Sequence, residues 1–111
     1  MNKILVAADA LIKARSTNCA LMNFPDNSAP LTVEEAFAIQ DAILEKSSKE
    51  IVAWKVGPAS EHFPPTCAAI VRENLARSSA KLSNSCRLKG IECEVAFKLN
   101  KDLPPENAPY S

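Results

Sequence analysis

The sequence predicts an α+β fold in which two N-terminal helices precede a small mixed or antiparallel sheet. Helical periodicity dominates the first half of the chain, β-type alternation marks the second half, and helical spacing does not return after the first strand. This order lacks the strand–helix–strand repeat of a doubly wound sheet. With 111 residues the chain has room for one small domain, with a helix and loop over 1–30 and a helix plus strands over 31–111.

The first helix is expected over residues 3–16, where apolar residues recur at helical spacing. A loop rich in Asn, Ser, Asp and Pro follows as far as Pro30. We expect this loop to bury Leu21, Met22 and Phe24.

The second helix is expected to begin with a capping box in "LTVEE". In that motif the Thr32 hydroxyl accepts a hydrogen bond from the Glu35 amide, and the Glu35 side chain accepts one from the Thr32 amide. The lysines of "KSSKE" suit the negative end of the helix dipole, where the helix should end. Its predicted inward stripe consists of Val33, Ala36, Phe37, Gln40, Ile43 and Leu44.

Residues 50–57 alternate as a strand and contain one unusual member, Lys55. Its side chain either reaches the strand edge with its ammonium in water or is held partly buried, where desolvation favours the neutral amine. After Gly57, "PASEHFPPTCAAI" holds three prolines and is expected to be a loop. The loop contains His62, either as a solvated side chain or as a catalytic group.

The run "GIECEVAFKL" at residues 90–99 is expected to be the last strand. Alternation puts Glu92 and Glu94 on the same face, close enough for their carboxylates to reach one cation. The other interpretation is a half-buried strand with one polar face.

Composition narrows the possible functions. Thirteen basic and thirteen acidic residues give zero formal net charge, which argues against a nucleic-acid partner. No apolar stretch is long enough to suggest a membrane span, and the N-terminal segment lacks the uninterrupted apolar run of a secretory signal, so we expect a cytoplasmic protein. The four cysteines lack CxxC spacing and are expected to be reduced thiols. With two glycines the chain cannot build a glycine-rich phosphate loop.

Four segments, "LTVEEAFAIQDAI", "VAWKVGPAS", "PTCAAI" and "LKGIECEVAFKLNKDLPPENAPYS", occur in an order and spacing that point to a known family. Together they resemble the N-terminal part of the 2-keto-4-pentenoate hydratase branch of the fumarylacetoacetate hydrolase superfamily. The resemblance covers roughly residues 30–111. It implies that the helices and sheet form the N-terminal portion of a fold like that of fumarylacetoacetate hydrolase.

The resemblance also implies a site. Glu92 and Glu94 match the ExE pair that holds Mg²⁺ or Mn²⁺ in the family, Lys55 matches its active-site lysine, and Ser60 falls where a hydroxyl lies beside the substrate. The implied substrate is a small 2-hydroxy-2,4-dienoate or 2-oxo acid of aromatic catabolism, which a hydratase attacks with water. A related decarboxylase uses a similar site, and a hydrolase relying on His62 with an adjacent carboxylate is a minor alternative.

The sequence departs from the family in two places. The resemblance implies a third metal carboxylate well beyond Glu94, but only a short segment follows that residue. We therefore expect the chain to be part of a longer protein and to be inactive as an enzyme on its own. Pro58 also removes an amide donor next to the lysine strand. The competing hypothesis is therefore a non-catalytic assembly domain, and in either case the unfinished sheet predicts a homo-oligomer.

Overall fold

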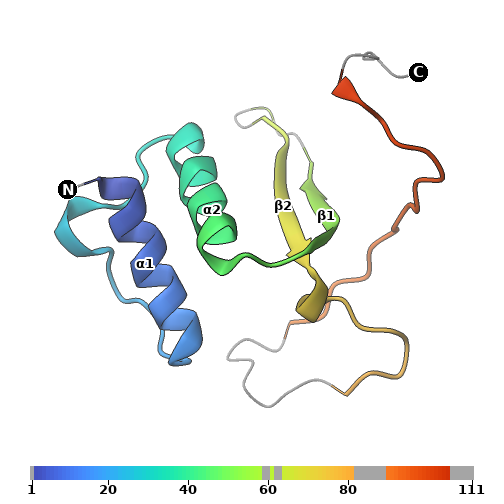
Figure 1. Ribbon diagram of the computed structural model, residues 1–111, viewed down its shortest axis with the longest axis horizontal. Helices are drawn as coiled ribbons and strands as arrows, with labels where there is room; N and C mark the ends of the chain where they lie inside the picture. Colours follow the sequence, from blue (N-terminus) through green and yellow to red (C-terminus); the bar gives the residue numbers. More distant parts are fainter. Residues whose placement is uncertain (1, 59–60, 62–63, 82–89, 106–111) are drawn as a thin grey trace.

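The computed structural model describes residues 2–58, 61, 64–81 and 90–105 of the chain. In this part the protein is a small α+β structure in which two helices stand beside a two-stranded antiparallel sheet, as the sequence predicts (Figure 1). Ser60 and His62 lie outside the described residues. The elements are α1 (Lys3–Ser16), η1 (Pro25–Asn27), α2 (Val33–Ser47), β1 (Ile51–Gly57), β2 (Thr66–Val71) and η2 (Arg72–Asn74).

Helix α1 confirms the first predicted helix. Its N-cap is Asn2, whose side-chain oxygen accepts a hydrogen bond from the Ile4 amide at 3.0 Å. Lys13 and Arg15 occupy the last turn, where positive charge is favourable beside the unpaired carbonyls. The helix therefore has a local signal at each end.

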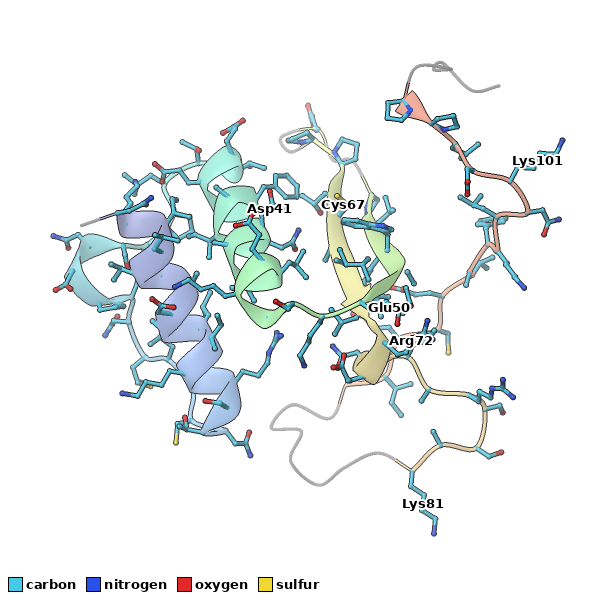
Figure 2. All side chains as sticks on the ribbon, viewed as in Figure 1. Asp41, Glu50, Cys67, Arg72, Lys81 and Lys101 are labelled. Atoms are coloured by element: carbon cyan, nitrogen blue, oxygen red, sulfur yellow. The ribbon has the colours of Figure 1, made fainter. Side chains whose placement is uncertain are left out.

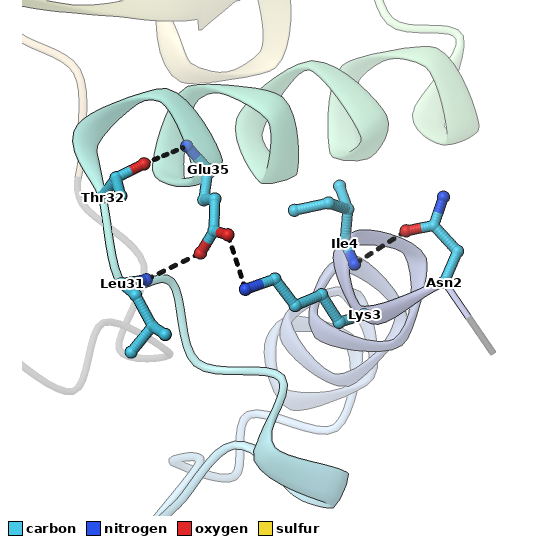
Figure 3. A network of polar contacts seen from close by, with 6 residues as sticks. All are labelled: Asn2, Lys3, Ile4, Leu31, Thr32 and Glu35. Atoms are coloured by element: carbon cyan, nitrogen blue, oxygen red, sulfur yellow. Dashed lines mark hydrogen bonds and ion pairs between the residues drawn. The ribbon is translucent and has the colours of Figure 1, made fainter.

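Helix α2 begins at the predicted capping residue, with one change in the bonding (Figure 3). The Thr32 hydroxyl accepts from the Glu35 amide at 3.2 Å, as expected. The predicted return bond is wrong: the Glu35 carboxylate accepts from the Leu31 amide at 2.8 Å instead of from the Thr32 amide. The same carboxylate pairs with Lys3 at 2.5 Å, so the cap also ties the start of α2 to the start of α1.

The two helices run in the same direction (Figure 1) and pack against each other. Ala7 and Ala8 are fully buried on α1, where alanines let two helix backbones approach closely. The buried residues of α2 are Ile39 and Ala42, neither of which belongs to the predicted stripe. The expectation for Met22 is wrong, because its side chain is 87% exposed. Partly buried residues packed against this core are Ile4, Leu11, Phe24 and Ile43.

The sheet is an antiparallel hairpin in which β1 confirms the predicted strand. Its register pairs Lys55 with Ala68 and Gly57 with Thr66, and an irregularity between Ile51 and Ala53 marks a bulge. A Cβ atom on Gly57 would lie 2.6 Å from the Thr66 hydroxyl, so a larger residue at this position would require the Thr66 side chain to shift.

Strand β2 corrects the prediction of a loop throughout the proline-rich stretch. The prolines end at residue 65, and the following "TCAAIV" pairs with β1. It carries β-branched residues at both ends and has its partner only a short connection away. The structure places β2 between α2 and β1 (Figure 1).

The predicted last strand is wrong. Residues 90–99 have no strand assignment and run as an extended trace beyond β1 (Figure 1). A strand needs a neighbouring backbone for its hydrogen bonds, and in the described chain the ladder consists of β1 and β2 alone. The apolar side chains of this segment are accordingly exposed, Phe97 by 87%.

Candidate functional site

The structure brings three of the predicted site residues into contact. The Lys55 ammonium lies 2.7 Å from Glu92 Oε2 and 2.5 Å from Glu94 Oε1, donating a hydrogen bond to each. The lysine belongs to β1 and the two glutamates belong to the extended segment beyond it. The contact therefore joins residues that are 37 and 39 positions apart in the sequence.

The extended backbone explains how two glutamates reach one lysine. In extended chain, side chains two residues apart point to the same side, whether or not the segment is hydrogen-bonded into a sheet. The predicted pairing of Glu92 and Glu94 is thus retained although the strand itself is not formed. Lys55 in turn projects from a regular part of β1, where it pairs with Ala68.

This cluster, Lys55 with Glu92 and Glu94, lies at the surface. The side chains are 47%, 74% and 55% exposed, respectively. Lys55 therefore adopts the solvent-reaching orientation and not the buried one considered from the sequence. Solvent screens the ion pairs, so their main effect is on the position of the three side chains and not on the overall stability.

The contacts within the cluster favour the charged forms of Lys55 and Glu92. Hydrogen bonds to Glu92 and then to Glu94 raise the pKa of Lys55 above its ordinary value. The hydrogen bond from the Lys55 ammonium lowers the pKa of Glu92. Lys55 is therefore a cation at neutral pH, which disfavours the neutral-amine alternative for a proton-transfer role.

The cluster can be compared with the Mg²⁺ or Mn²⁺ that the resemblance implies. Two carboxylates already converge on one cationic group, and hard divalent cations are commonly held by one or two carboxylates with water completing the shell. Among the residues that the structure describes, no group of three or more His, Cys, Asp or Glu side chains is gathered for a metal. Glu92 and Glu94 therefore fit such a cation as a two-carboxylate site that shares its oxygens with an ammonium.

A second ion pair was not anticipated from the sequence. The Arg72 guanidinium donates to both Glu50 oxygens at 2.6 Å, and the Arg72 amide donates to the Glu50 carbonyl at 2.9 Å (Figure 2). The two residues flank the open end of the hairpin, next to the paired residues Ile51 and Val71. Predicting their contact requires the strand register, which could not be read from the sequence. The Glu50–Arg72 pair joins the two strand ends at the open end of the hairpin and does not involve Lys55, Glu92 or Glu94.

Three of the four cysteines lie in the described part of the chain. Cys19, Cys67 and Cys93 are free and exposed. Cys67 meets α2 through its backbone, because its carbonyl accepts a hydrogen bond from the Gln40 side chain at 3.3 Å.

Comparisons with known proteins return no relatives: no family model, no curated protein and no solved structure matches the chain. None of the described helices has both the length and the apolar character needed to cross a bilayer.

Proposed function

We propose that this chain contributes Lys55, Glu92 and Glu94 to the site of a metal-dependent lyase that adds water to a 2-hydroxy-2,4-dienoate. The observation that supports the proposal is the contact of one lysine with both carboxylates of the ExE pair. These are three of the four residues that the family resemblance selects, and the fold brings the three together from two separate segments. A fumarylacetoacetate hydrolase-like fold is part of the same proposal.

In this proposal Glu92 and Glu94 hold Mg²⁺ or Mn²⁺, which when bound supplies Lewis-acid stabilisation of negative charge on the substrate. Lys55 remains protonated and donates hydrogen bonds to the carboxylate or enolate oxygen of the substrate. Binding of an anionic substrate would thus exchange one carboxylate partner of Lys55 for another. Ser60 is proposed to orient the substrate through its hydroxyl, in a cytoplasmic enzyme of aromatic catabolism.

Decarboxylation of a 2-oxo diacid uses the same residue types and remains the closest chemical alternative. Both reactions need a cation beside a developing enolate and a lysine that steers the substrate carboxylate. The two are separated by the product: a hydratase yields a 4-hydroxy-2-oxo acid, whereas a decarboxylase releases CO₂.

A non-catalytic assembly domain is the second candidate, and exposed apolar residues favour it. Trp54 and Val56 on β1 are 55% and 69% exposed, and Ile91, Val95 and Phe97 are each more than four-fifths exposed. Contiguous exposed apolar surface is characteristic of an interaction site. Burial of this surface against further copies would give the proposed homo-oligomer.

A Mn²⁺ titration of the 111-residue chain, followed by electron paramagnetic resonance, tests the metal part of the proposal. We expect saturable binding with roughly millimolar affinity, as for a site of two carboxylates. Glu92→Gln and Glu94→Gln should each abolish it, whereas the exposed helix variant Glu45→Gln should bind as the parent does. Lys55→Met should tighten binding, because the ammonium competes with Mn²⁺ for the same oxygens.

Turnover is tested separately with the dienoate and Mg²⁺, by loss of the ultraviolet absorbance of the conjugated acid and by product analysis. Metal binding that Glu92→Gln leaves unchanged would refute the site. Because this chain alone is expected to lack the third metal carboxylate, the lyase is decided only in a protein that also supplies that carboxylate. In such a protein, metal binding at Glu92 without any conversion of dienoate or oxo diacid would refute the lyase and favour the assembly domain.

A further inference from the structure

A cavity lies between the two helices and β2. Its volume is about 690 Å³. Small-molecule sites occupy roughly 300–1,000 Å³, so this hollow has the size of a ligand site. Its walls come from α1, α2, β2 and η2, whereas Lys55 lies on β1. The lining residues whose chemistry matters are Leu11, Ile12, Ile39, Ile43, Val71 and Arg15.

The apolar lining of the cavity comes from three elements. Leu11 and Ile12 line it from α1, Ile39 and Ile43 line it from α2, and Val71 lines it from β2. Ile39 and Val71 are buried, while Leu11, Ile12 and Ile43 are only partly covered by the protein. A straight hydrocarbon chain would cover these partly exposed side chains and remove them from water.

Five of the polar lining residues gather at one end of the cavity, whereas the Gln40 side chain lies in the middle of α2 and donates a hydrogen bond to the Cys67 carbonyl. Arg15 and Ser16 end α1, and Ser47 ends α2. Lys49 lies between α2 and β1, and Asn74 ends η2. Because α1 and α2 run in the same direction, both helices finish at this end (Figure 1). The cavity is therefore amphipathic along its length, with hydroxyl, amide and basic groups around its mouth.

The charge balance at the mouth is positive. Arg15 has no ion-pair partner among the described residues, and Lys49 pairs with Glu73 at a relatively long 3.5 Å. The carbonyl ends of the two helices contribute partial negative charge, but the N–H groups of Thr17 and Ser48 cap carbonyls in both last turns. Two full positive charges therefore face one full negative charge.

We propose that this cavity binds a small carboxylic acid with a straight apolar chain, its carboxylate at Arg15 and its chain along Ile39 and Ile43. Arg15 supplies a planar donor group suited to a carboxylate. The hydroxyls of Ser16 and Ser47 lie at the same mouth but donate their protons to the Lys13 and Leu44 carbonyls, so the ligand's carboxylate depends on Arg15. The site is separate from the Lys55 cluster and does not depend on the lyase proposal.

Calorimetric titration of the full chain with decanoate and, separately, with the uncharged 1-decanol tests the proposal. We expect saturable 1:1 binding of decanoate, weakened about fivefold by Arg15→Gln, which is the upper range for one exposed ion pair. Arg15→Gln should leave decanol binding unchanged. Arg77→Gln, which removes an exposed charge outside the cavity, is the matched control and should change neither ligand.

Ala36→Leu provides an independent arm, since Ala36 lines the cavity from an exposed helix position where leucine is a good helix former. It should weaken both ligands while circular dichroism shows an intact fold. Non-saturable binding, or decanoate affinity equal in the parent, Arg15→Gln and Ala36→Leu proteins, would overturn the proposal. Equal affinities would instead assign binding to the exposed apolar residues near Phe97.

Discussion

Truncation of Ile39 to alanine tests whether the helix pair is the stabilising core of this chain. Ile39 is 4% exposed and packs against the two buried alanines of α1. The change removes three carbon atoms at about 0.8 kcal/mol each, or about 2.4 kcal/mol in all. Alanine is the better helix former by about 0.4 kcal/mol, so we expect a net loss of about 2 kcal/mol. No further cavity cost is added, because Ile39 already borders the 690 Å³ hollow.

Urea unfolding followed by helical circular dichroism measures this loss. With a typical denaturant dependence, the midpoint should fall by roughly 1 M. Met22→Ala is the matched control, because its side chain is 87% exposed and its truncation should leave the midpoint nearly unchanged. Equal midpoints for Ile39→Ala and Met22→Ala would refute the assignment of the core to α1 and α2.

Three further predictions concern the cap, the core and the ion-pair cluster. Thr32→Ala should lower the free energy of unfolding by about 1 kcal/mol, because it removes the hydrogen bond from the Glu35 amide to the Thr32 hydroxyl. Ser78→Ala, at an exposed position, is the control and should have no effect; equal effects of the two substitutions would contradict the cap. Ala8→Leu should cost about 1–3 kcal/mol through overpacking at a fully buried site, and unchanged thermal unfolding would show that α1 and α2 are not in contact there. Followed by nuclear magnetic resonance, the pKa of Glu92 should lie below its ordinary 4.5, so its contact with Lys55 is complete above that pH and is lost as the pH falls through the lower pKa of the folded state. In Lys55→Met the pKa of Glu92 should return to the ordinary range. An unshifted pKa in the parent protein would refute the contact.

The helices were predictable because their signals are local. Helical spacing over residues 3–16, together with the threonine–glutamate cap at Thr32, identifies both helices from neighbouring residues alone. The identity of the buried residues was less accessible. The choice between Ile39 with Ala42 and the adjacent stripe depends on where α1 packs, which is a property of the tertiary structure and not of the helix period.

The sheet shows where reasoning from alternation ends. β1 and the run at 90–99 both alternate, but only β1 has a strand to pair with in the described chain. The three-residue site was predictable in part: alternation placed Glu92 and Glu94 on one side, and the family resemblance singled out Lys55. Their direct contact was not, because an ion pair across 37 residues depends on how the segment returns to β1.

The shared direction of α1 and α2 restricts how the chain between them can vary. An antiparallel pair can be joined by a tight turn of two to five residues, but here the chain must travel back along the full length of a helix. Fifteen residues of α2 span about 22 Å, which extended chain covers in roughly seven residues. Leu21, Asn23 and Pro25 line a hollow together with residues of α1, as expected for a return path beside that helix. Deletions in this connection should therefore be tolerated down to that length and no further, whereas insertions should be accepted freely.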